Sequence, residues 1–201
     1  MRRGVLVALI IVVTGIAAGT LWYLGDHLSS ERGRVMTIGD AAIGGPFSLT
    51  DQYGHTRTDR DFAGRYMLVY FGYTNCPDIC PTTLSVIADA MEKLGGAAQQ
   101  VVPIFITVDP TRDTPRALKN YLAAFGPEFV GLTGSKSSIA AVAKEYHVYY
   151  RAHKAAKNGS YAVDHSNVIY LMGPDGKFIA NYDETLGPDG LAKAISRHIG
   201  V

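Results

Sequence analysis

After residue 45 the hydrophobic pattern alternates between short apolar runs and segments with apolar residues at helical spacing. Residues 66–72 and 101–108 are almost continuously apolar, which is typical of strands buried on both faces of a sheet. Polar and apolar positions alternate across residues 47–58 around a Tyr53-Gly54 turn, and this pattern predicts a β-hairpin. We also expect a strand at 129–132, a late hairpin of 161–172 and 177–182, and helices at 81–94, 114–125, 137–146 and 188–199.

This order of elements indicates the fold class. Strands that alternate with helices, followed by an antiparallel hairpin and a last helix, predict an α/β domain built in layers. The order βαβ…ββα is that of a thioredoxin-like three-layer domain, here with an additional N-terminal β-hairpin. We place this domain at residues 45–201.

The first 24 residues follow a different pattern. Residues 5–24 carry no charge and have the length of about 20 residues that a transmembrane helix needs. Arg2 and Arg3 precede this stretch, which predicts a cytoplasmic N-terminus at residues 1–4 and the domain on the outer side of the membrane. A cleaved signal peptide is the alternative, because residues 17–19 are small, but the apolar stretch continues beyond them. Residues 25–44 are polar and glycine-rich and predict a linker.

Composition limits the possible functions only coarsely. The chain has 201 residues, 47% of them apolar, which is enough for one domain with a sizeable core and a short appendage. Its formal net charge of +1 lacks the basic excess typical of nucleic-acid-binding proteins. We therefore expect no nucleic-acid partner.

The two cysteines, Cys76 and Cys80, lie between the strand at 66–72 and the helix at 81–94. A structural disulfide is the usual interpretation outside the cytoplasm, but a bond across so few residues stabilises a fold only weakly. A helix N-terminus lowers the pKa of a nearby thiol and enriches the reactive thiolate. With three intervening residues, both cysteines would share one helix face with Cα atoms about 6 Å apart. That spacing suits either a disulfide or a shared metal ion.

His165 is the candidate for a third ligand. It belongs to the first strand of the predicted late hairpin, which in a thioredoxin-like topology packs beside the strand that precedes the cysteines. We expect Asp164 to accept a hydrogen bond from its ring and to fix the tautomer. Two thiolates and one imidazole suit Cu(I), while zinc with a bound water is the alternative. The other five histidines have ordinary structural explanations: His27, His55, His147, His153 and His198.

Several motifs occur together along the chain. They are TNCPDICPTTL (74–84), FITVDPTRDTP (105–115), VDHS (163–166) and YLMGP (170–174), with FSLTD (47–51) and VYY (148–150). On these motifs the segment from 45 to 199 resembles the Sco/SenC family. Tyr149 and Tyr150 within them are expected at a buried strand edge rather than on a docking surface.

The resemblance implies a thioredoxin-like fold in which Cys76, Cys80 and His165 bind one copper ion. The donor set favours Cu(I), with Cu(II) as the alternative. Asp78 and Asp164 match as tuning residues. It further implies a role in maturing the binuclear copper site of cytochrome c oxidase, with the copper-bearing oxidase subunit as partner. Another periplasmic copper chaperone or a thiol reductase is a further expected partner. We expect a single-pass protein of the bacterial inner membrane with its C-terminal domain in the periplasm; the alternative is the mitochondrial inner membrane, facing the intermembrane space.

Three functions use such cysteines. A metallochaperone presents copper to an acceptor and needs His165. A thiol–disulfide oxidoreductase needs Cys76 and Cys80 as its redox-active pair, and His165 is dispensable. A peroxidase of the peroxiredoxin type normally has a remote resolving cysteine, whereas both cysteines here lie in one turn. The sequence favours the metallochaperone, with the oxidoreductase as the alternative.

Overall fold

The computed structural model describes residues 43–156 and 159–200. The predicted transmembrane anchor (5–24) and nearly all of the predicted linker (25–44) lie outside the described residues. Within the described ranges, no helix is both long enough and apolar enough to span a membrane.

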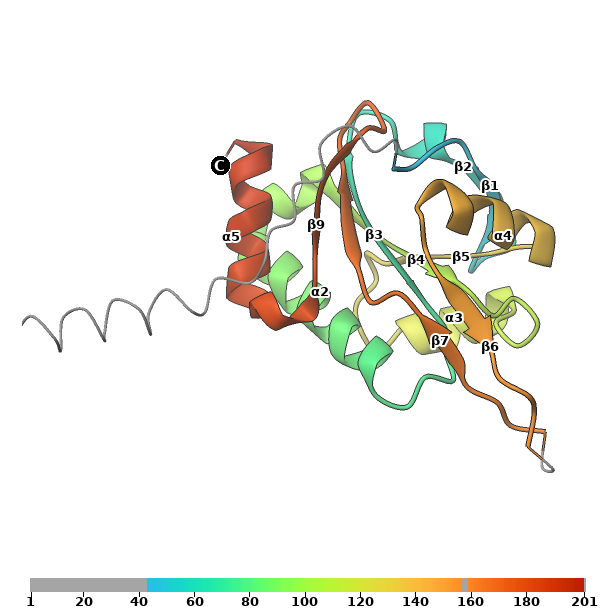
Figure 1. Cartoon of the computed structure of the whole chain (residues 1–201). Helices are drawn as coiled ribbons and strands as arrows, with labels where there is room; N and C mark the ends of the chain where they lie inside the picture. Colours follow the sequence, from blue (N-terminus) through green and yellow to red (C-terminus); the bar gives the residue numbers. More distant parts are fainter. Residues whose placement is uncertain (1–42, 157–158, 201) are drawn as a thin grey trace, which may run out of the picture. The chain divides into compact units, whose positions relative to one another are not determined.

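The described part of the chain is built on a mixed seven-stranded sheet with the strand order β2-β1-β5-β4-β3-β8-β9 (Figure 1). β3, β4 and β5 are parallel to one another, whereas β8 pairs antiparallel with β3, and β1 antiparallel with β5. The strands are β1 (Ser48–Asp51), β2 (Thr56–Thr58), β3 (Tyr66–Gly72), β4 (Val101–Thr107), β5 (Val130–Thr133), β8 (Ile169–Met172) and β9 (Phe178–Tyr182). The predicted N-terminal hairpin is thus confirmed as β1 and β2.

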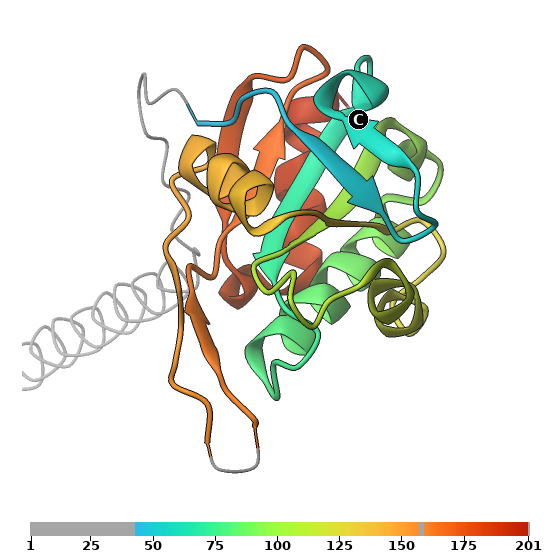
Figure 2. The same cartoon turned by 90° about the vertical axis from the view of Figure 1, so that its right-hand side faces the viewer.

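Helices cover both faces of this sheet. α2 and α5 pack against each other on one face, while α4 covers the opposite face (Figure 2). The helices are α2 (Ile79–Leu94), α3 (Pro115–Leu122), α4 (Lys136–Glu145) and α5 (Gly187–Ile199), with short 3-10 helices η1 (Asp59–Phe62), η2 (Gly95–Gln100) and η3 (Glu184–Leu186). The predicted three-layer α/β arrangement is confirmed.

The core lies where the apolar runs predicted it. Every residue of β4 is buried, and four consecutive residues of β3, 68–71, have no exposed surface. Two-sided burial explains why these strands read as continuous apolar runs rather than as alternating ones. The start of α3 also matches its sequence signal, because Thr114 Oγ1 caps the helix by accepting from the Ala117 N–H at 3.2 Å, ahead of Pro115.

The late hairpin is only partly as predicted. β8 and β9 pair as expected, but residues 163–165 form a separate strand, β7 (Val163–His165), which pairs with β6 (Tyr150–Ala152) in a two-stranded sheet. Ser166 and Asn167 interrupt the pattern, because Ser166 N–H donates to the Tyr149 carbonyl and Asn167 binds the Tyr70 hydroxyl. The β6–β7 hairpin consequently projects away from the main sheet (Figures 1 and 2).

The tyrosines at the start of this hairpin are also not as predicted. The expected buried strand edge is wrong for Tyr149, which is 58% exposed, while Tyr150 is half-buried. The cause is the separate two-stranded sheet, since β6 packs on no further strand of the described chain.

Candidate metal centre

The cysteines lie where the central strand β3 passes into α2. Cys76 is in the connecting loop and half-buried, whereas Cys80 is in the first turn of α2 and has no exposed surface. Gly72 ends β3 directly behind them. A Cβ at this position would lie 3.0 Å from Cys80 Sγ and 2.8 Å from Phe105 Cε2. The glycine therefore permits the close approach of the helix to the strand.

The structure brings His165 to the two cysteines. Cys80 Sγ lies 3.2 Å from His165 Nε2, and the Cys80 N–H donates to Cys76 Sγ at 3.4 Å. Both thiols are free, and one ligand atom from each of the three residues lies within 4.8 Å of the other two. In the described ranges this is the only such group of three or more Cys, His, Asp or Glu side chains. The three side chains could therefore hold one metal ion.

The surroundings of His165 favour a neutral imidazole that can bind a metal through Nε2. Its Nδ1 lies 3.1 Å from the Ser166 carbonyl oxygen, so a proton on Nδ1 would be donated there and leave Nε2 free to bind a metal. Burial lowers the pKa of His165, and the Ser166 carbonyl and the Asp164 charge oppose that shift. The rings of Tyr70 and Tyr73 contact the imidazole edge-on, with centroids 6.2 and 5.9 Å away.

The predicted hydrogen bond between His165 and Asp164 is wrong. Asp164 pairs instead with His153 Nε2 at 2.8 Å on the exposed surface of the hairpin. Successive side chains of a strand point to opposite faces, so Asp164 faces away when His165 faces the cysteines. Asp78 is exposed at the N-cap position of α2 and makes no side-chain capping bond. Tuning by Asp78 or by the Asp164 charge stays a prediction.

The expected lowering of the thiol pKa is wrong for Cys80. Burial raises the pKa of Cys80 to about 12, and the neighbouring Cys76 acts in the same direction. The helix begins two residues earlier than predicted, at Ile79, which turns Cys80 into the core. A bound metal cation would reverse this preference, because a coordinating thiol loses its proton.

Asp113 anchors the cysteine loop, a role that the sequence reasoning missed. It is fully buried and accepts hydrogen bonds from the Thr74 N–H (3.0 Å), the Thr74 hydroxyl (2.6 Å) and the Thr107 hydroxyl (2.6 Å). Burial raises the pKa of Asp113, and the hydrogen bonds from Thr107 and Thr74 oppose this. Its position in the loop between a buried strand and the next helix was the available signal.

Asn167 was also missed. Its Oδ1 accepts from the Tyr70 hydroxyl (3.0 Å) and the Thr83 hydroxyl (3.2 Å), and its Nδ2 donates to Glu184. One side chain thus joins β3, α2 and η3 to the chain just beyond His165. A polar residue directly before the apolar run 168–171 was the only sequence signal for it.

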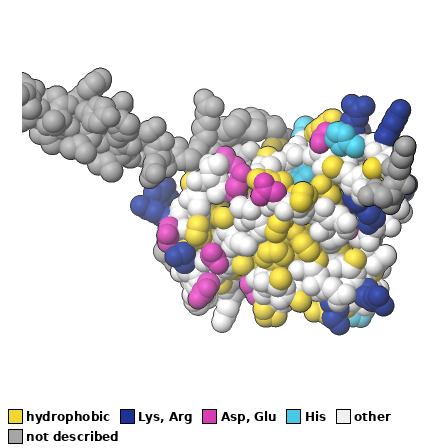
Figure 3. Space-filling model, turned by 90° about the horizontal axis from the view of Figure 1, so that it is seen from below, with side chains coloured by type: hydrophobic (Ala, Val, Ile, Leu, Met, Phe, Trp, Pro, Cys, Tyr) yellow, Lys and Arg dark blue, Asp and Glu magenta, His cyan; other side chains and the backbone are white. Residues whose placement is uncertain are grey.

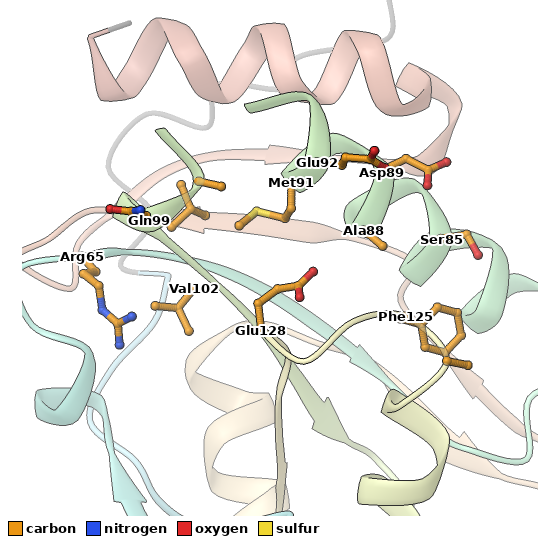
Figure 4. Close-up of a pocket in the computed structure, with 13 residues that line it drawn as sticks. Arg65, Ser85, Ala88, Asp89, Met91, Glu92, Gln99, Val102, Phe125 and Glu128 are labelled. Carbon is orange, nitrogen blue, oxygen red and sulfur yellow. The ribbon is translucent and has the colours of Figure 1, made fainter. Parts of the chain in front are cut away.

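A separate cleft lies away from the three ligands. It has a volume of about 660 Å³ and lies between the outer side of α2, the start of β4 and the loop after α3. Figure 4 shows Arg65 towards one end, Phe125 towards the other and Glu128 between them. Neither cysteine nor His165 lines this cleft, so it is separate from the candidate metal centre.

Figure 3 views the molecule from the end at which α2 begins and the β6–β7 hairpin projects. Hydrophobic side chains gather at the centre of this face, acidic side chains lie mainly to one side, and most basic side chains lie on the side of the hairpin. The two sides of this end therefore differ in charge.

Fold and site together define a thioredoxin-like protein adapted to thiol and metal chemistry. The cysteines occupy the strand-to-helix turn typical of that fold, and a histidine from a separate hairpin completes a Cys2His group. The sequence profile of the SCO1/SenC family matches residues 35–200. The chain belongs to the SCO1/SenC family.

Individual relatives agree with this assignment. Human "Protein SCO1 homolog, mitochondrial" is 38% identical over 176 residues, which are 87% of this chain and 58% of the human protein. The structure of Bradyrhizobium japonicum ScoI with copper bound is 45% identical, with a TM-score of 0.73 over 78% of this chain and 99% of that one. BsSco, described as having a disulfide switch and as a member of the Sco family of cytochrome c oxidase assembly proteins, is 26% identical, with a TM-score of 0.61 over 83% of this chain and 99% of its own.

Proposed function

We propose that this protein is a copper metallochaperone that binds one copper ion through Cys76, Cys80 and His165 and delivers it to the binuclear copper site of cytochrome c oxidase. The observation that carries the proposal is the 3.2 Å approach of His165 Nε2 to Cys80 Sγ, with Cys76 beside them. Two thiolates and an imidazole form a soft donor set that suits Cu(I), and the imidazole also suits Cu(II). The copper-bound structure of the Bradyrhizobium relative supports the same cargo.

Delivery of the ion follows from the unequal exposure of the ligands. Cys80 is buried, whereas Cys76 is half-buried and belongs to a loop. A three-coordinate copper leaves a position that an acceptor thiolate can enter, after which protein ligands are released one at a time. Cys76 is the ligand that an acceptor reaches first.

The proposed acceptor is the copper-bearing subunit of cytochrome c oxidase. The description of BsSco as belonging to a family of oxidase assembly proteins supports this choice. We place the domain on the outer face of a bacterial inner membrane, tethered by residues 5–24 through the linker 25–44. The identity to a Bradyrhizobium protein supports this location, while the mitochondrial human relative supports the alternative of a mitochondrial inner membrane. Another periplasmic copper chaperone or a thiol reductase would supply the copper or keep the cysteines reduced.

A thiol–disulfide oxidoreductase is the second candidate. Cys76 and Cys80 lie close enough for the Cys80 N–H to contact Cys76 Sγ, and BsSco is described as having a disulfide switch. In this reaction the two thiols of the protein form one disulfide. The two electrons reduce a disulfide of the partner to two thiols, and the two protons released pass to the partner's sulfurs. His165 takes no part in this balance.

An anaerobic Cu(I) titration of the reduced full-length protein in detergent tests the proposal. We expect one equivalent to bind tightly, and Cys76→Ser, Cys80→Ser and His165→Ala to weaken binding by about 100-fold or more. His153→Ala is the matched control, because His153 lies on the same hairpin but pairs with Asp164. Wild-type affinity in His165→Ala would remove that residue from the site. Absence of stoichiometric binding would leave the dithiol oxidoreductase as the function.

A further inference from the structure

The outer edge of β6 offers free backbone groups. His153 N–H donates to the Ala162 carbonyl and Ser166 N–H donates to the Tyr149 carbonyl, both at 2.9 Å. Backbone N–H and C=O groups alternate in direction along an antiparallel strand. The N–H and C=O groups of residues 149, 151 and 153 therefore point towards β7. Tyr150 and Ala152 therefore direct their N–H and C=O groups away from β7. Within the described ranges no hydrogen bond engages the backbone of either residue on that side.

This free edge borders a cleft of about 440 Å³. Tyr150, Ala152 and His153 line it from the hairpin, while the loop at 108–111 and Lys136 at the start of α4 line the opposite side. Neighbouring strands of a sheet need a spacing of about 4.8 Å. The outward groups of β6 therefore lie beside this cleft, where an added strand would begin to pair.

Charge around this edge favours an acidic occupant. Lys136, Arg151 and Lys154 form no ion pair with any described residue. The acidic groups nearby are already engaged. Asp109 is bound by Arg112 and by the Tyr161 hydroxyl, and Asp164 is paired with His153. The basic side of the face in Figure 3 is the hairpin side, in agreement with this balance.

The same edge lies next to the metal centre. Tyr150 pairs across the hairpin with His165, so a strand added to β6 would lie two strand spacings, about 10 Å, from the His165 backbone. A segment bound there would hold the remainder of its protein near half-buried Cys76. Exposed Tyr149, immediately before β6, adds the kind of aromatic side chain that is enriched at interfaces.

We propose that an extended segment with acidic side chains, supplied by the protein that receives the copper, adds to β6 as a third strand of the hairpin sheet. The backbone hydrogen bonds of Tyr150 and Ala152 supply binding, and Lys136, Arg151 and Lys154 select for acidic side chains. This inference rests on the proposed function, because the occupant is the copper acceptor.

Ala152→Pro tests the free edge. Proline removes the outward N–H of residue 152. It leaves the hydrogen bonds to β7 in place, because the backbone groups of residues 149, 151 and 153 make them. Ala152→Ser keeps the N–H and is the matched control. The probe is the soluble domain of the oxidase subunit that receives the copper. It is prepared without copper and added to the full-length protein in detergent. We expect Ala152→Pro to weaken association by about tenfold or more, through the lost hydrogen bond and the bulk of the ring, and Ala152→Ser to match the wild type.

Two further measurements sharpen this test. Hydrogen exchange of the Tyr150 and Ala152 amides should slow when the acceptor domain is added. Lys136→Glu should weaken association and make it less sensitive to salt. Equal acceptor binding by Ala152→Pro and Ala152→Ser, or unchanged exchange, would overturn the inference. Protection that appears when the protein is concentrated alone would assign the edge to a second copy and also overturn it.

Failure of the proposed function would appear differently. Copper titrations of the same variants, made without the acceptor, should all give wild-type affinity, since residue 152 is not a ligand. If the proline and serine variants bind the acceptor domain equally well while copper binding is intact, this inference alone fails. Absence of copper binding in the wild type is a failure of the proposed function, and it removes the inference with it.

Discussion

The hydroxyl of Tyr70 donates a hydrogen bond to Asn167 Oδ1 at 3.0 Å, which ties the central strand to the chain two residues beyond His165. The Thr83 hydroxyl donates to the same oxygen at 3.2 Å, and Thr83 lies one turn after Cys80 in α2. A single amide thus connects the histidine segment with the cysteine helix. This connection joins the histidine segment to the main sheet and to α2, although β7 itself belongs to a different sheet.

We expect Asn167→Ala to weaken copper binding by about 10- to 100-fold, as residues that orient metal ligands do. The variant keeps all three ligands, so the loss reflects their placement alone. Competition with a Cu(I) chelator measures the affinity. Asn181→Ala is the control, because Asn181 lies on β9 and pairs in register with Tyr170 rather than near the ligands. Equal affinities of the two variants would contradict the positioning role.

A second prediction concerns Gly72. A methyl group there would meet Cys80 Sγ and Phe105 at 3.0 and 2.8 Å, inside normal contact distance. We expect Gly72→Ala to lower the free energy of unfolding by about 1–3 kcal/mol, the usual cost of overpacking, and to weaken copper binding by displacing the sulfur. Urea unfolding followed by circular dichroism measures the first effect and a copper titration the second.

Gly96→Ala is the matched control for Gly72→Ala. A Cβ at Gly96 would meet nothing within 4 Å, so its effect should stay within about 0.5 kcal/mol. A Gly72→Ala variant as stable as Gly96→Ala, with unchanged copper affinity, would show that the strand and helix can separate without consequence.

The sequence predicted the elements whose apolar residues are buried. β3 and β4 were visible as continuous apolar runs because both faces of each strand are covered. The sequence pattern did not distinguish β6 and β7 from the neighbouring segments. β6 (Tyr150–Ala152) is largely exposed, so its pattern carries little hydrophobic signal, and its pairing with β7 is decided by contacts distant in sequence.

The site could be predicted as a set of residues but not in its details. The motif spacing and topology indicated that His165 would approach the cysteines, whereas the acceptor of its Nδ1 depended on which face of β7 each side chain takes. Likewise, the helix dipole argued for a lowered thiol pKa, but burial of Cys80 prevailed, because desolvation of a thiolate outweighs a helix terminus.

The unequal burial of the two thiols gives a third prediction. We expect iodoacetamide to modify half-buried Cys76 well before fully buried Cys80 in the reduced, copper-free protein, by about 100-fold in rate. The raised pKa of Cys80, caused by burial, acts in the same direction. Timed quenching and mass spectrometry of the peptides measure the two rates. Equal rates would mean that α2 opens at its start faster than the reagent reacts.

A fourth prediction concerns the acid stability of the N-terminal hairpin. Asp51 is buried; its Oδ1 accepts from the Tyr53 and His55 N–H groups and its Oδ2 from Arg57 Nε, all at 2.9 Å. Burial raises the pKa of Asp51, but the hydrogen bonds from His55, Arg57 and Tyr53 outweigh it and hold the pKa below its usual value. The ionised carboxylate is therefore favoured in the folded state.

The sign of the pH dependence follows from that shift. A carboxyl group with a lower pKa in the folded state stabilises the fold above its unfolded pKa of about 3.9, and this stabilisation is lost as the pH falls through the folded value. At pH 7 we expect Asp51→Ala to cost about 2–3 kcal/mol. Asp51→Asn should cost less, because its Oδ1 can keep both amide bonds and only the Arg57 pair is lost. Both differences from the wild type should shrink in urea unfolding below about pH 3.

Asp189→Asn is the control for the Asp51 variants, since Asp189 forms only an exposed pair with Lys93 and should change stability by less than about 1 kcal/mol at any pH. If the cost of Asp51→Ala were the same at pH 3 as at pH 7, the stabilisation would come from the shape of the side chain and not from its charge. If Asp51→Asn cost as much as Asp51→Ala, the Arg57 pair rather than the turn amides would account for the stabilisation of the hairpin by Asp51.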